Sequence, residues 1–525
     1  MTRKLLTIFA AFSLLAACTP QVQPADVTVS VSADGTSQYI TLPAGSSVQQ
    51  ALTAAGASLS QTDRVSPPAY TLLIEGLTIT VTRVREEFET QQVIIPFERQ
   101  ELHNESMPAG ETRLVQAGQN GLREITIRHV VENGLETGTS VVSDSILQPS
   151  TPEIVMIGVQ SPFAPLPIPG KLAFLTGGNA WLMDVSTSNR RPLVTTADLD
   201  GHIFSLSPDG KWLLFTRKSD LPADQEINTL WVVNTEAQPA ALISLQVSNV
   251  VHFAAWQPGM QYLIAYSTVE PRVDAPGWQA NNDLHFLHFS NSELGRTEDI
   301  LETNNGGIYG WWGMTFAWSP DGQSLAYSRP DGVGLVDISN AGLIPLSNIT
   351  PLNTHSDWAW TPGLVWGSEQ TIFMVSHAAP TGLVGPEDSP NFDLLAVSLT
   401  DDQGTTLLPQ TGMFAYPAVS SLRQDESGSI YLVAFMQAIF PTQSATSRYQ
   451  LDVMNNDATN LRSLFPAQGQ SGLLPQTPVW APSPLETGAY FIGIIYAGNL
   501  WIVDATSGQS QQVTGDGLTI QIDWK

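Results

Sequence analysis

The first regular pattern of apolar and polar residues in the chain predicts a hairpin. Residues Val27–Val31 alternate apolar and polar side chains, as a strand with one buried face does. Asp34-Gly35 is typical of a tight hairpin turn, and Tyr39–Leu42 follows as the partner strand.

A helix and further strands are expected next. Ser46–Ala55 repeats its apolar residues at helical spacing, and Ser47 is placed to cap the helix. Strand patterns return at Leu72–Ile74 and Leu77–Val84. The order strand, strand, helix, strand predicts a small α+β domain over residues 27–84.

Residues 86–158 alternate polar and apolar side chains with almost no helical spacing, which predicts extended strands. Glycines recur in this region and suit turns with positive φ and close approach of neighbouring backbones. They are Gly110, Gly118, Gly121, Gly134 and Gly158. A structural role for each glycine is favoured over direct ligand contact.

From residue 171 onward the sequence repeats. Each copy holds a short apolar strand, a turn and a second strand, and the clearest turns read Ser-Pro-Asp-Gly at Ser207–Gly210 and Ser319–Gly322. Six copies of the first strand lie near residues 204, 254, 316, 364, 418 and 478. Four-stranded units at this spacing are typical of β-propeller blades.

A seventh first strand is expected at Thr519–Trp524. It has no following strands, whereas Lys171–Thr176 has no first strand before it. Pairing the two segments leaves no free sheet edge. The sequence therefore predicts a mainly β protein in which residues 171–525 form a seven-bladed β-propeller.

The N-terminal segment predicts export and lipid attachment. Arg3 and Lys4 precede the apolar run Leu5–Leu15, which is too short for a permanent transmembrane helix. Leu15-Ala16-Ala17-Cys18 resembles the bacterial lipobox, in which the cysteine is joined to diacylglycerol. An ordinary cleaved signal with an incidental cysteine is the alternative, but Cys18 is the chain's sole cysteine. The protein is expected on the extracytoplasmic side of a membrane, at the cell surface or in a periplasm.

Composition excludes several classes of function. The chain has 22 Lys and Arg against 49 Asp and Glu, a net charge of −27, which argues against nucleic acid and against electrostatic binding to an anionic bilayer. Charged residues make up 14% and apolar residues 42%, which excludes a disordered chain. We interpret the acidity as a solubilising surface.

Short sequence segments in residues 27–84 and 86–158 resemble known domains of cell-envelope proteins. Thr41–Gly45 and Ile79–Arg83 resemble the ubiquitin-like domain of YabE-type wall proteins and resuscitation-promoting factors. Met107–Thr112, Ala117–Gly121 and Glu132–Gly134 resemble the five-glycine domain that commonly follows it. The resemblance implies an extended single-layer β module, suggested in the family to bind wall glycans that contain N-acetylglucosamine. In wall enzymes such a pair carries a transglycosylase or peptidase domain, and no motif of either occurs here.

The repeat in residues 171–525 resembles the TolB-type family of periplasmic propellers, which implies a fold and says little about activity. The expected segments are a lipoprotein signal peptide (1–17), the lipidated cysteine and a tether (18–26), the ubiquitin-like domain (27–84), the five-glycine domain (85–159), a Pro-rich linker (160–170) and the propeller (171–525).

The tryptophans point to a binding face. Of the chain's 14, nine sit on repeat positions and are predicted to be core. The other five are Trp278, Trp311, Trp312, Trp358 and Trp360. In a four-stranded meander the second–third and fourth–first connections share one face, and all five fall on such connections of adjacent blades. They are expected to stack on sugar rings or anchor a partner, unless they pack the long insertions of that face.

Catalytic and metal signals are poor. His285 and His288 form the closest histidine pair, but residues three apart point to opposite faces of a strand. Asp198–Gly201 and Gly515–Gly517 lack the oxygen register of a calcium loop. No cofactor, metal site or catalytic residue is predicted.

The sequence thus favours a non-catalytic envelope lipoprotein, with a stalk that engages wall glycan and a head that binds a protein or glycan. One competing hypothesis is a propeller enzyme, a lyase or hydrolase of extracellular glycan whose acid and base are scattered over the blades. A TolB-like assembly factor with an envelope protein partner is a third.

Overall fold

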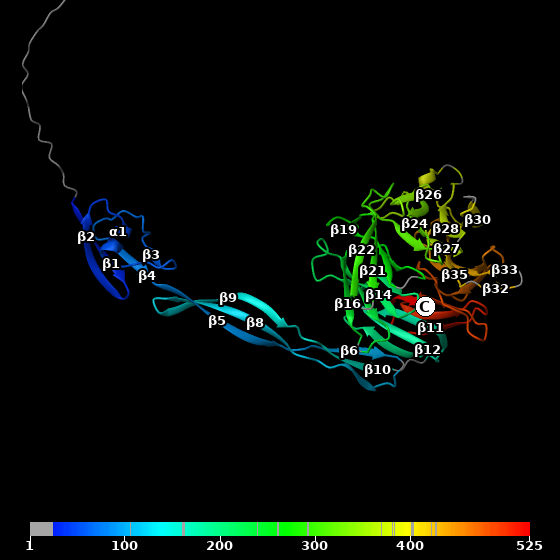
Figure 1. Ribbon diagram of the computed structural model, residues 1–525, viewed down its shortest axis with the longest axis horizontal. Coiled ribbons are helices and arrows are strands. Elements are labelled where there is room, and N and C mark those ends of the chain that lie inside the picture. Colours follow the sequence, from blue (N-terminus) through cyan, green and yellow to red (C-terminus); the bar gives the residue numbers. More distant parts are fainter. Residues whose placement is uncertain are drawn as a thin grey trace, which may run out of the picture. The chain divides into compact units, whose positions relative to one another are not determined.

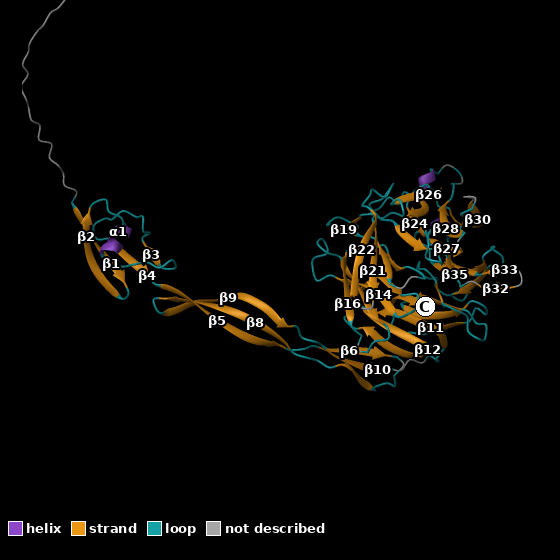
Figure 2. Ribbon diagram, in the orientation of Figure 1, coloured by secondary structure: helices purple, strands orange, loops and turns teal. Residues whose placement is uncertain are grey.

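The computed structural model describes residues 25–525 except for short gaps at residues 106, 160–162, 239, 260–261, 291–292, 369, 381, 383, 401–403, 422 and 426–427 (Figure 1). Cys18 and the expected signal peptide lie outside the described residues. The protein is mainly β, with 53% of residues in strands and 3% in helices (Figure 2). It divides into two compact units, Met1–Leu102 with Thr112–Met156, and His103–Glu111 with Ile157–Lys525.

The first unit begins with a small α+β domain. Its sheet has the order β2-β1-β4-β3, in which β1 (Asp26–Ala33) and β2 (Thr36–Pro43) form the predicted hairpin. Helix α1 (Val48–Ala54) packs its apolar face onto this sheet. The remaining strands are β3 (Arg64–Ser66) and β4 (Thr78–Thr82).

Capping defines the start of α1 as the sequence predicts. The backbone N–H of Ser47 donates to Oε1 of Gln50 at 2.8 Å, and the side chains of Val48, Ala51 and Leu52 are fully buried.

The strand expected at Leu72–Ile74 is wrong. Leu73 is buried, but its neighbours Leu72 and Ile74 are 62% and 65% exposed. The segment makes its backbone hydrogen bonds to the start of the helix, with the N–H of Leu73 donating to the carbonyl of Ser46 at 2.8 Å. One inward side chain between two outward ones mimics a strand pattern. The sheet takes β3 as its additional strand instead.

Arg83 joins the turns at one end of this domain. Its guanidinium donates to both carboxylate oxygens of Asp34 at 2.7 Å, to Asp63 at 2.7 Å and to the carbonyl of Ser58 at 2.6 Å. Burial alone would raise the pKa of Asp63, but hydrogen bonds from the N–H groups of Ser60 and Val84 and from Arg83 hold it well below its usual range.

A long three-stranded antiparallel sheet of order β5-β8-β9 follows in the same unit (Figure 1). Its strands are β5 (Val84–Ile95), β8 (Gly121–Glu132) and β9 (Leu135–Gln148). Most side chains of β5 and β9 are exposed, so this sheet has little core of its own and depends on its ladder of hydrogen bonds and cross-strand pairs.

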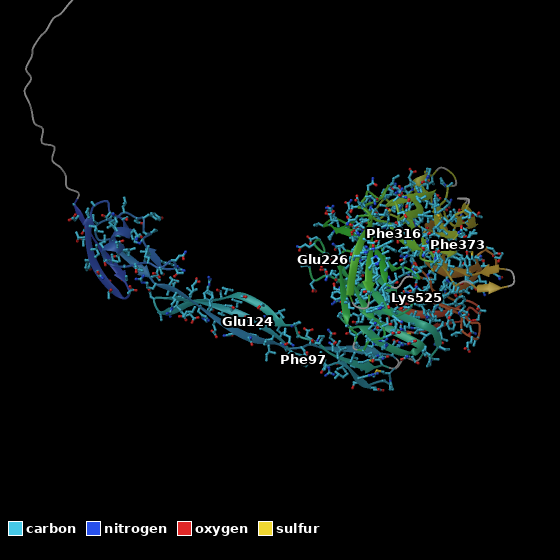
Figure 3. The ribbon with its side chains drawn as sticks, in the orientation of Figure 1. Phe97, Glu124, Glu226, Phe316, Phe373 and Lys525 are labelled. Atoms are coloured by element: carbon cyan, nitrogen blue, oxygen red, sulfur yellow. The ribbon has the colours of Figure 1, made fainter. Side chains whose placement is uncertain are left out.

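A shorter sheet has the order β6-β10-β7, formed by β6 (Arg99–Asn104), β10 (Glu153–Gly158) and β7 (Thr112–Gln116). Close packing explains the glycines near its ends. A Cβ at Gly118 would collide with the ring of Phe97, which Figure 3 labels, and a Cβ at Gly158 would collide with the carbonyl of Pro108.

Within the described residues, the second unit holds seven antiparallel sheets of three or four strands. The first has the order β12-β11-β41, with β11 (Pro167–Thr176), β12 (Asn179–Val194) and β41 (Thr519–Trp524). The second is β13 (Leu199–Leu206), β14 (Trp212–Lys218), β15 (Asn228–Asn234) and β16 (Leu242–Ser248). The third is β17 (Ala254–Trp256), β18 (Leu263–Tyr266), β21 (Leu284–Ser290) and β22 (Glu293–Leu301).

The fourth sheet is β23 (Thr315–Trp318), β24 (Leu325–Arg329), β25 (Gly332–Asp337) and β26 (Gly342–Asn348). The fifth is β27 (Leu364–Ser368), β28 (Thr371–His377), β29 (Phe392–Ser398) and β30 (Gly404–Leu408). The sixth is β31 (Ala418–Val419), β34 (Leu432–Ala438), β35 (Tyr449–Asn455) and β36 (Arg462–Phe465). The seventh is β37 (Val479–Trp480), β38 (Phe491–Tyr496), β39 (Asn499–Asp504) and β40 (Ser510–Gln512).

Two short hairpins extend the connections of this unit. They are β19 (Val269–Pro271) with β20 (Trp278–Ala280), and β32 (Arg423–Asp425) with β33 (Gly428–Ile430). Two 3₁₀ turns, η1 (Pro386–Asp388) and η2 (Pro441–Gln443), lie in other connections.

The last strand of the unit pairs with its first. Strand β41 runs antiparallel to β11, with Leu172 opposite Trp524 and Phe174 opposite Ile522. The N–H of Lys171 donates to the carbonyl of Lys525 at 2.6 Å, and the indole N–H of Trp524 donates to the carbonyl of Pro169 at 2.6 Å. The C-terminus therefore lies beside β11, as Figure 1 shows.

Tryptophans of the inner strands connect neighbouring sheets. The indole N–H of Trp256 donates to the carbonyl of Ser205 at 3.1 Å, and that of Trp366 donates to the carbonyl of Ala317 at 2.9 Å. Trp480 donates to the carbonyl of Ala418 at 3.0 Å. Each bond links an inner strand to the inner strand of the preceding sheet, so the repeated tryptophan helps to hold neighbouring sheets together.

Part of the glycine-rich region belongs to this second unit. Arg190 lies on β12 and forms an ion pair of 2.8 Å with Glu105, and the two side chains are only 7% and 14% exposed. The other carboxylate oxygen of Glu105 accepts the N–H of Gly515 at 2.6 Å. The expected linker also ends earlier than the sequence suggests, because Pro167–Gly170 already form the start of β11.

A buried carboxyl group on β35 gives a pH-dependent prediction. Asp452 is 5% exposed, and its Oδ1 makes no hydrogen bond to any described residue. Burial raises the pKa of Asp452 from 3.8 to about 6, against the hydrogen bonds from Ser463 and Gln450. The folded state keeps this proton after an unfolded aspartate has lost it, so folding stability falls as pH rises through that window.

We expect Asp452→Asn to be more stable than the wild type at neutral pH by about 1–3 kcal/mol, with no gain at pH values below the window. Urea unfolding at a series of pH values measures this difference. Asp457→Asn is the matched control, because hydrogen bonds from Thr459 lower the pKa of that exposed aspartate. An equal gain in both variants contradicts the assignment.

Candidate functional site

Connections between strands of the second unit carry the five tryptophans that depart from the repeat. Trp278 begins β20 in the hairpin between β18 and β21, and Trp311 and Trp312 precede β23. Trp358 and Trp360 precede β27.

Trp278, Trp312 and Trp311 form one continuous aromatic row. The ring centroids of Trp278 and Trp312 are 5.5 Å apart, and those of Trp312 and Trp311 are 5.9 Å apart in an edge-to-face arrangement. The indole N–H of Trp278 donates to the carbonyl of Trp312 at 3.3 Å, and the carbonyl of Trp311 accepts the N–H of Ala280 at 3.0 Å. The hairpin and the next connection are thereby held together.

The imidazole of His252 packs against two rings of this row. Its ring lies 5.6 Å from that of Trp278 and 6.1 Å from that of Trp312. Burial lowers the pKa of His252 to about 4, with a smaller contribution from His202, so the imidazole is neutral at physiological pH. A neutral ring suits the apolar packing, and this end of the row is a packed cluster.

Trp311 and Trp358 both line a small pocket of about 180 Å³. Tyr309 adds a third aromatic wall, and Asn353 and Thr354 supply polar groups. The hydroxyl of Thr354 is used internally, because it donates to the carbonyl of Trp358 at 2.5 Å.

A second pocket of about 340 Å³ adjoins the first and shares Trp358 with it. The 3₁₀ turns η1 and η2 line this pocket and bring Asp388, Thr442 and Gln443 to its wall. At the rim, Nε2 of His355 lies 3.1 Å from Oδ1 of Asp388, and both side chains are well exposed. The two pockets therefore adjoin through a shared wall that includes Trp358, and together they are called the divided groove.

Trp360 does not belong to this surface. Its side chain is 2% exposed, and its indole N–H donates to the carbonyl of Met413 at 2.9 Å. It packs edge-on against Phe392 at 4.9 Å. Trp358 packs against the same core cluster but is only partly buried, and it is the one of the two that lines the pockets.

The polar members of the groove were missed by sequence reasoning. Asn353, Thr442 and Gln443 are common loop residues with no motif around them. A partial signal existed, because Met436–Tyr449 is one of the long second–third insertions and it contains η2.

The carboxylates noted in the sequence serve the fold. Asp198 forms an ion pair with Arg217 at 2.7 Å, and Asp516 accepts a hydrogen bond from the hydroxyl of Thr176 at 2.5 Å. His285 bridges Asp283 and Asp299 at 3.0 and 2.8 Å. Among the described residues, no group of three or more His, Cys, Asp and Glu side chains is arranged to hold a metal.

A further pocket of about 470 Å³ lies on the single-layer sheet of the first unit. Ile94 and Ile146, which are 62% and 65% exposed, form its apolar walls. Arg123 and Asp144, paired at 3.3 Å, supply its charged groups. Exposed aliphatic side chains beside a paired charge give this sheet a surface for a ligand.

Comparison with known families identifies two modules within the first 160 residues of the chain. Residues 86–160 match the G5 domain, and residues 29–69 match the G5-linked ubiquitin-like domain. The resemblance drawn from the glycine-rich words is thereby confirmed.

Two curated relatives share this region. The chain is 27% identical over 141 residues to resuscitation-promoting factor RpfB of Mycolicibacterium smegmatis, covering 27% of this chain and 38% of that protein. It is 25% identical over 156 residues to resuscitation-promoting factor Rpf2 of Corynebacterium glutamicum, covering 30% of this chain and 41% of that protein. The chain thus spans less than half the length of either relative.

Solved structures show similarity at the level of the fold. The G5 domain of an IgA1 protease is 25% identical, covering 15% of this chain and 94% of that one with a TM-score of 0.13. The xyloglucanase of Xanthomonas campestris is 10% identical, covering 69% of this chain and 53% of that one with a TM-score of 0.42. The neighbours of the second unit are propeller-like, and similarity of this degree carries no information about activity.

Of the helices in the described part of the chain, none has the length and apolar character needed to cross a membrane.

The packed end of the row and its open end predict different mutational effects. We expect Trp312→Ala and Trp278→Ala to lower the free energy of unfolding by about 2 kcal/mol, because each ring is partly buried against the other and against His252. Trp311→Ala should cost less, since its ring borders the small pocket. Urea unfolding monitored by circular dichroism measures all three. Equal losses in the three variants contradict the division.

Proposed function

We propose that this protein is a non-catalytic binding protein of the cell envelope, with a glycan-binding module in residues 85–159 and a ligand-binding propeller head. The match of residues 86–160 to the G5 domain carries this proposal, because the G5 and resuscitation-promoting-factor relatives are extracellular envelope proteins and G5 domains are associated with wall glycan. The pocket formed by Ile94, Ile146, Arg123 and Asp144 is the candidate glycan site of this module.

For the head, we propose a seven-bladed TolB-like propeller. The seven sheets of the described residues, the recurrent Ser-Pro-Asp-Gly turns and the pairing of β41 with β11 support it. The turns are built alike in two copies. Gly210 donates to the carbonyl of Ser207 at 2.8 Å, and Gly322 donates to the carbonyl of Ser319 at 2.9 Å.

Binding is favoured over catalysis at the divided groove. An enzyme that cleaves glycans by acid–base chemistry needs two carboxyl groups at the bond it breaks. Among the residues that line the two pockets, Asp388 is the sole carboxylate, and it is paired with His355. Tryptophan walls without a second acid suit recognition of a glycan or a protein partner.

We further propose that the chain is attached to a membrane through diacylglycerol on Cys18. The lipobox-like Leu15–Cys18 word supports this attachment. Two or more acyl chains hold a protein at a bilayer where one is marginal.

Co-sedimentation of the full-length protein with purified peptidoglycan sacculi tests the wall-binding proposal. We expect the wild type to pellet with sacculi and Ile146→Lys to remain largely in solution, because a lysine would place a charge on the apolar wall of the pocket.

Leu135→Lys is the matched control for this experiment. Leu135 is an aliphatic residue on the same strand, is 74% exposed and does not line the pocket. We expect it to pellet like the wild type. If the wild type stays in solution, or if both variants pellet fully, the assigned glycan site is refuted.

Metabolic labelling with a tagged fatty acid tests the anchor. We expect Cys18→Ser to incorporate no label and to leave the membrane fraction, because the thiol that would carry diacylglycerol is absent. Undiminished label in Cys18→Ser rules out lipidation at this residue.

A further inference from the structure

We propose that the divided groove of the head binds an uncharged, hydroxyl-rich glycan, with a sugar ring in each pocket and Trp358 between them. The proposal rests on the binding role proposed for the head and names the class of ligand. It commits to a neutral sugar, whereas the function above leaves a protein and a glycan open.

The first argument is the shape of the walls. Three aromatic side chains, Tyr309, Trp311 and Trp358, line the smaller pocket. Flat aromatic rings bury ligand surface at a low cost in side-chain entropy, and their faces suit the C–H face of a pyranose ring. No indole N–H of Trp311 or Trp358 is used in a hydrogen bond to another described residue, so both remain as donors for the groove.

The second argument is the chemistry of the polar groups. The side chains of Asn353, Thr442 and Gln443 line the larger pocket. Oδ1 of Asn353 accepts the N–H of His355 at 3.2 Å, whereas no hydrogen bond to another described residue is found for the side chains of Thr442 and Gln443. Amides and hydroxyls both donate and accept, which is what a ligand rich in hydroxyl groups requires. A few such groups within a largely apolar pocket are the usual means of fixing a small ligand.

Charge excludes an acidic glycan. No Lys or Arg lines either pocket, and the histidine at the rim, His355, already lies 3.1 Å from Oδ1 of Asp388. The chain as a whole carries a net charge of −27. A uronic acid polymer would meet repulsion here with no compensating cation, whereas a neutral sugar would meet none.

Size supports a ligand that spans both pockets. The smaller pocket, about 180 Å³, lies below the roughly 300–1,000 Å³ typical of small-molecule sites, and the larger, about 340 Å³, lies within it. Because Leu352, Asn353, Thr354 and Trp358 belong to both walls, a chain of linked rings can occupy the two pockets at once.

A different groove of the same unit shows the contrast. The hollow of about 920 Å³ between β22 and the turn before β26 is lined by Asp299, Glu302 and His285 and by no Trp, Tyr or Phe side chain. It is the larger space but offers charge and no stacking surface. The divided groove and this hollow therefore differ in the chemistry of the residues that line them.

Isothermal titration calorimetry of the full-length protein tests the inference. The probes are the β-1,4-linked tetrasaccharides of glucose and of N-acetylglucosamine, and the α-1,4-linked tetrasaccharide of galacturonic acid. All proteins carry Ile146→Lys, so that the pocket of the first unit does not contribute. We expect at least one neutral probe to bind, with an affinity independent of ionic strength, and the galacturonate probe not to bind.

Two substitutions assign the binding to the groove. Trp311→Ala and Gln443→Ala should each weaken binding of the neutral probe by about tenfold. Gln443 is exposed and its side chain makes no hydrogen bond to another described residue, so it keeps the test valid if Trp311→Ala is poorly folded.

Phe440→Ala is the matched control. Phe440 is 63% exposed on the same connection but lines neither pocket, and its loss should leave the affinity unchanged.

The inference is overturned if no neutral probe binds, if galacturonate binds equally well, or if binding survives both groove substitutions. Wall binding through Ile146 is measured separately, so it stands or falls independently. A third outcome is that the head binds a protein partner, that Trp311→Ala abolishes this binding, and that no glycan binds. This result would support a binding role for the head and would contradict the proposal that its ligand is a neutral glycan.

Discussion

The second unit depends on one pairing between distant parts of the chain. Strand β41 supplies the missing neighbour of β11, so that the last residues of the sequence and residues 167–176 share one ladder. Without it, β11 would present an unpaired inner edge and the neighbouring inner strands would lose a packing partner. The indole of Trp524 strengthens the pairing by binding the carbonyl of Pro169. The loops that line the divided groove connect strands of this unit. Their positions therefore depend on the sheets that the pairing of β41 with β11 holds together.

Tryptophan is used in this unit in two physically different ways. On the inner strands the rings of Trp256, Trp366 and Trp480 are buried. Each indole N–H donates to a backbone carbonyl of the preceding sheet. Off the repeat, Trp311 and Trp358 keep part of the ring toward a pocket. The same side chain therefore links sheets where its N–H is bound internally, and lines a pocket where it is not.

Much of the fold could be predicted from the sequence because its elements are local and periodic. The hairpin around Asp34-Gly35, the helix capped at Ser47 and the first strand of each sheet all follow from residues close together in the chain. Leu72–Ile74 failed because one buried leucine imitates alternation. The groove was only partly predictable. Trp358 could be placed on a connection between two repeats, whereas Gln443 reaches the groove through tertiary packing. The burial of Trp360 also depends on tertiary contacts, with Phe392 and the carbonyl of Met413, which the sequence pattern does not reveal.

The register of the single-layer sheet has a mechanical consequence. The chain enters β5 at Val84, opposite Glu132 of β8, and leaves β9 at Gln148, opposite Leu122 at the other end of β8. A pull on those two points acts along the strands, at right angles to the ladder bonds, and loads them all in shear. A sheet that buries little would then resist extension far better than its modest core suggests, because its hydrogen bonds must break together and cannot unzip one by one.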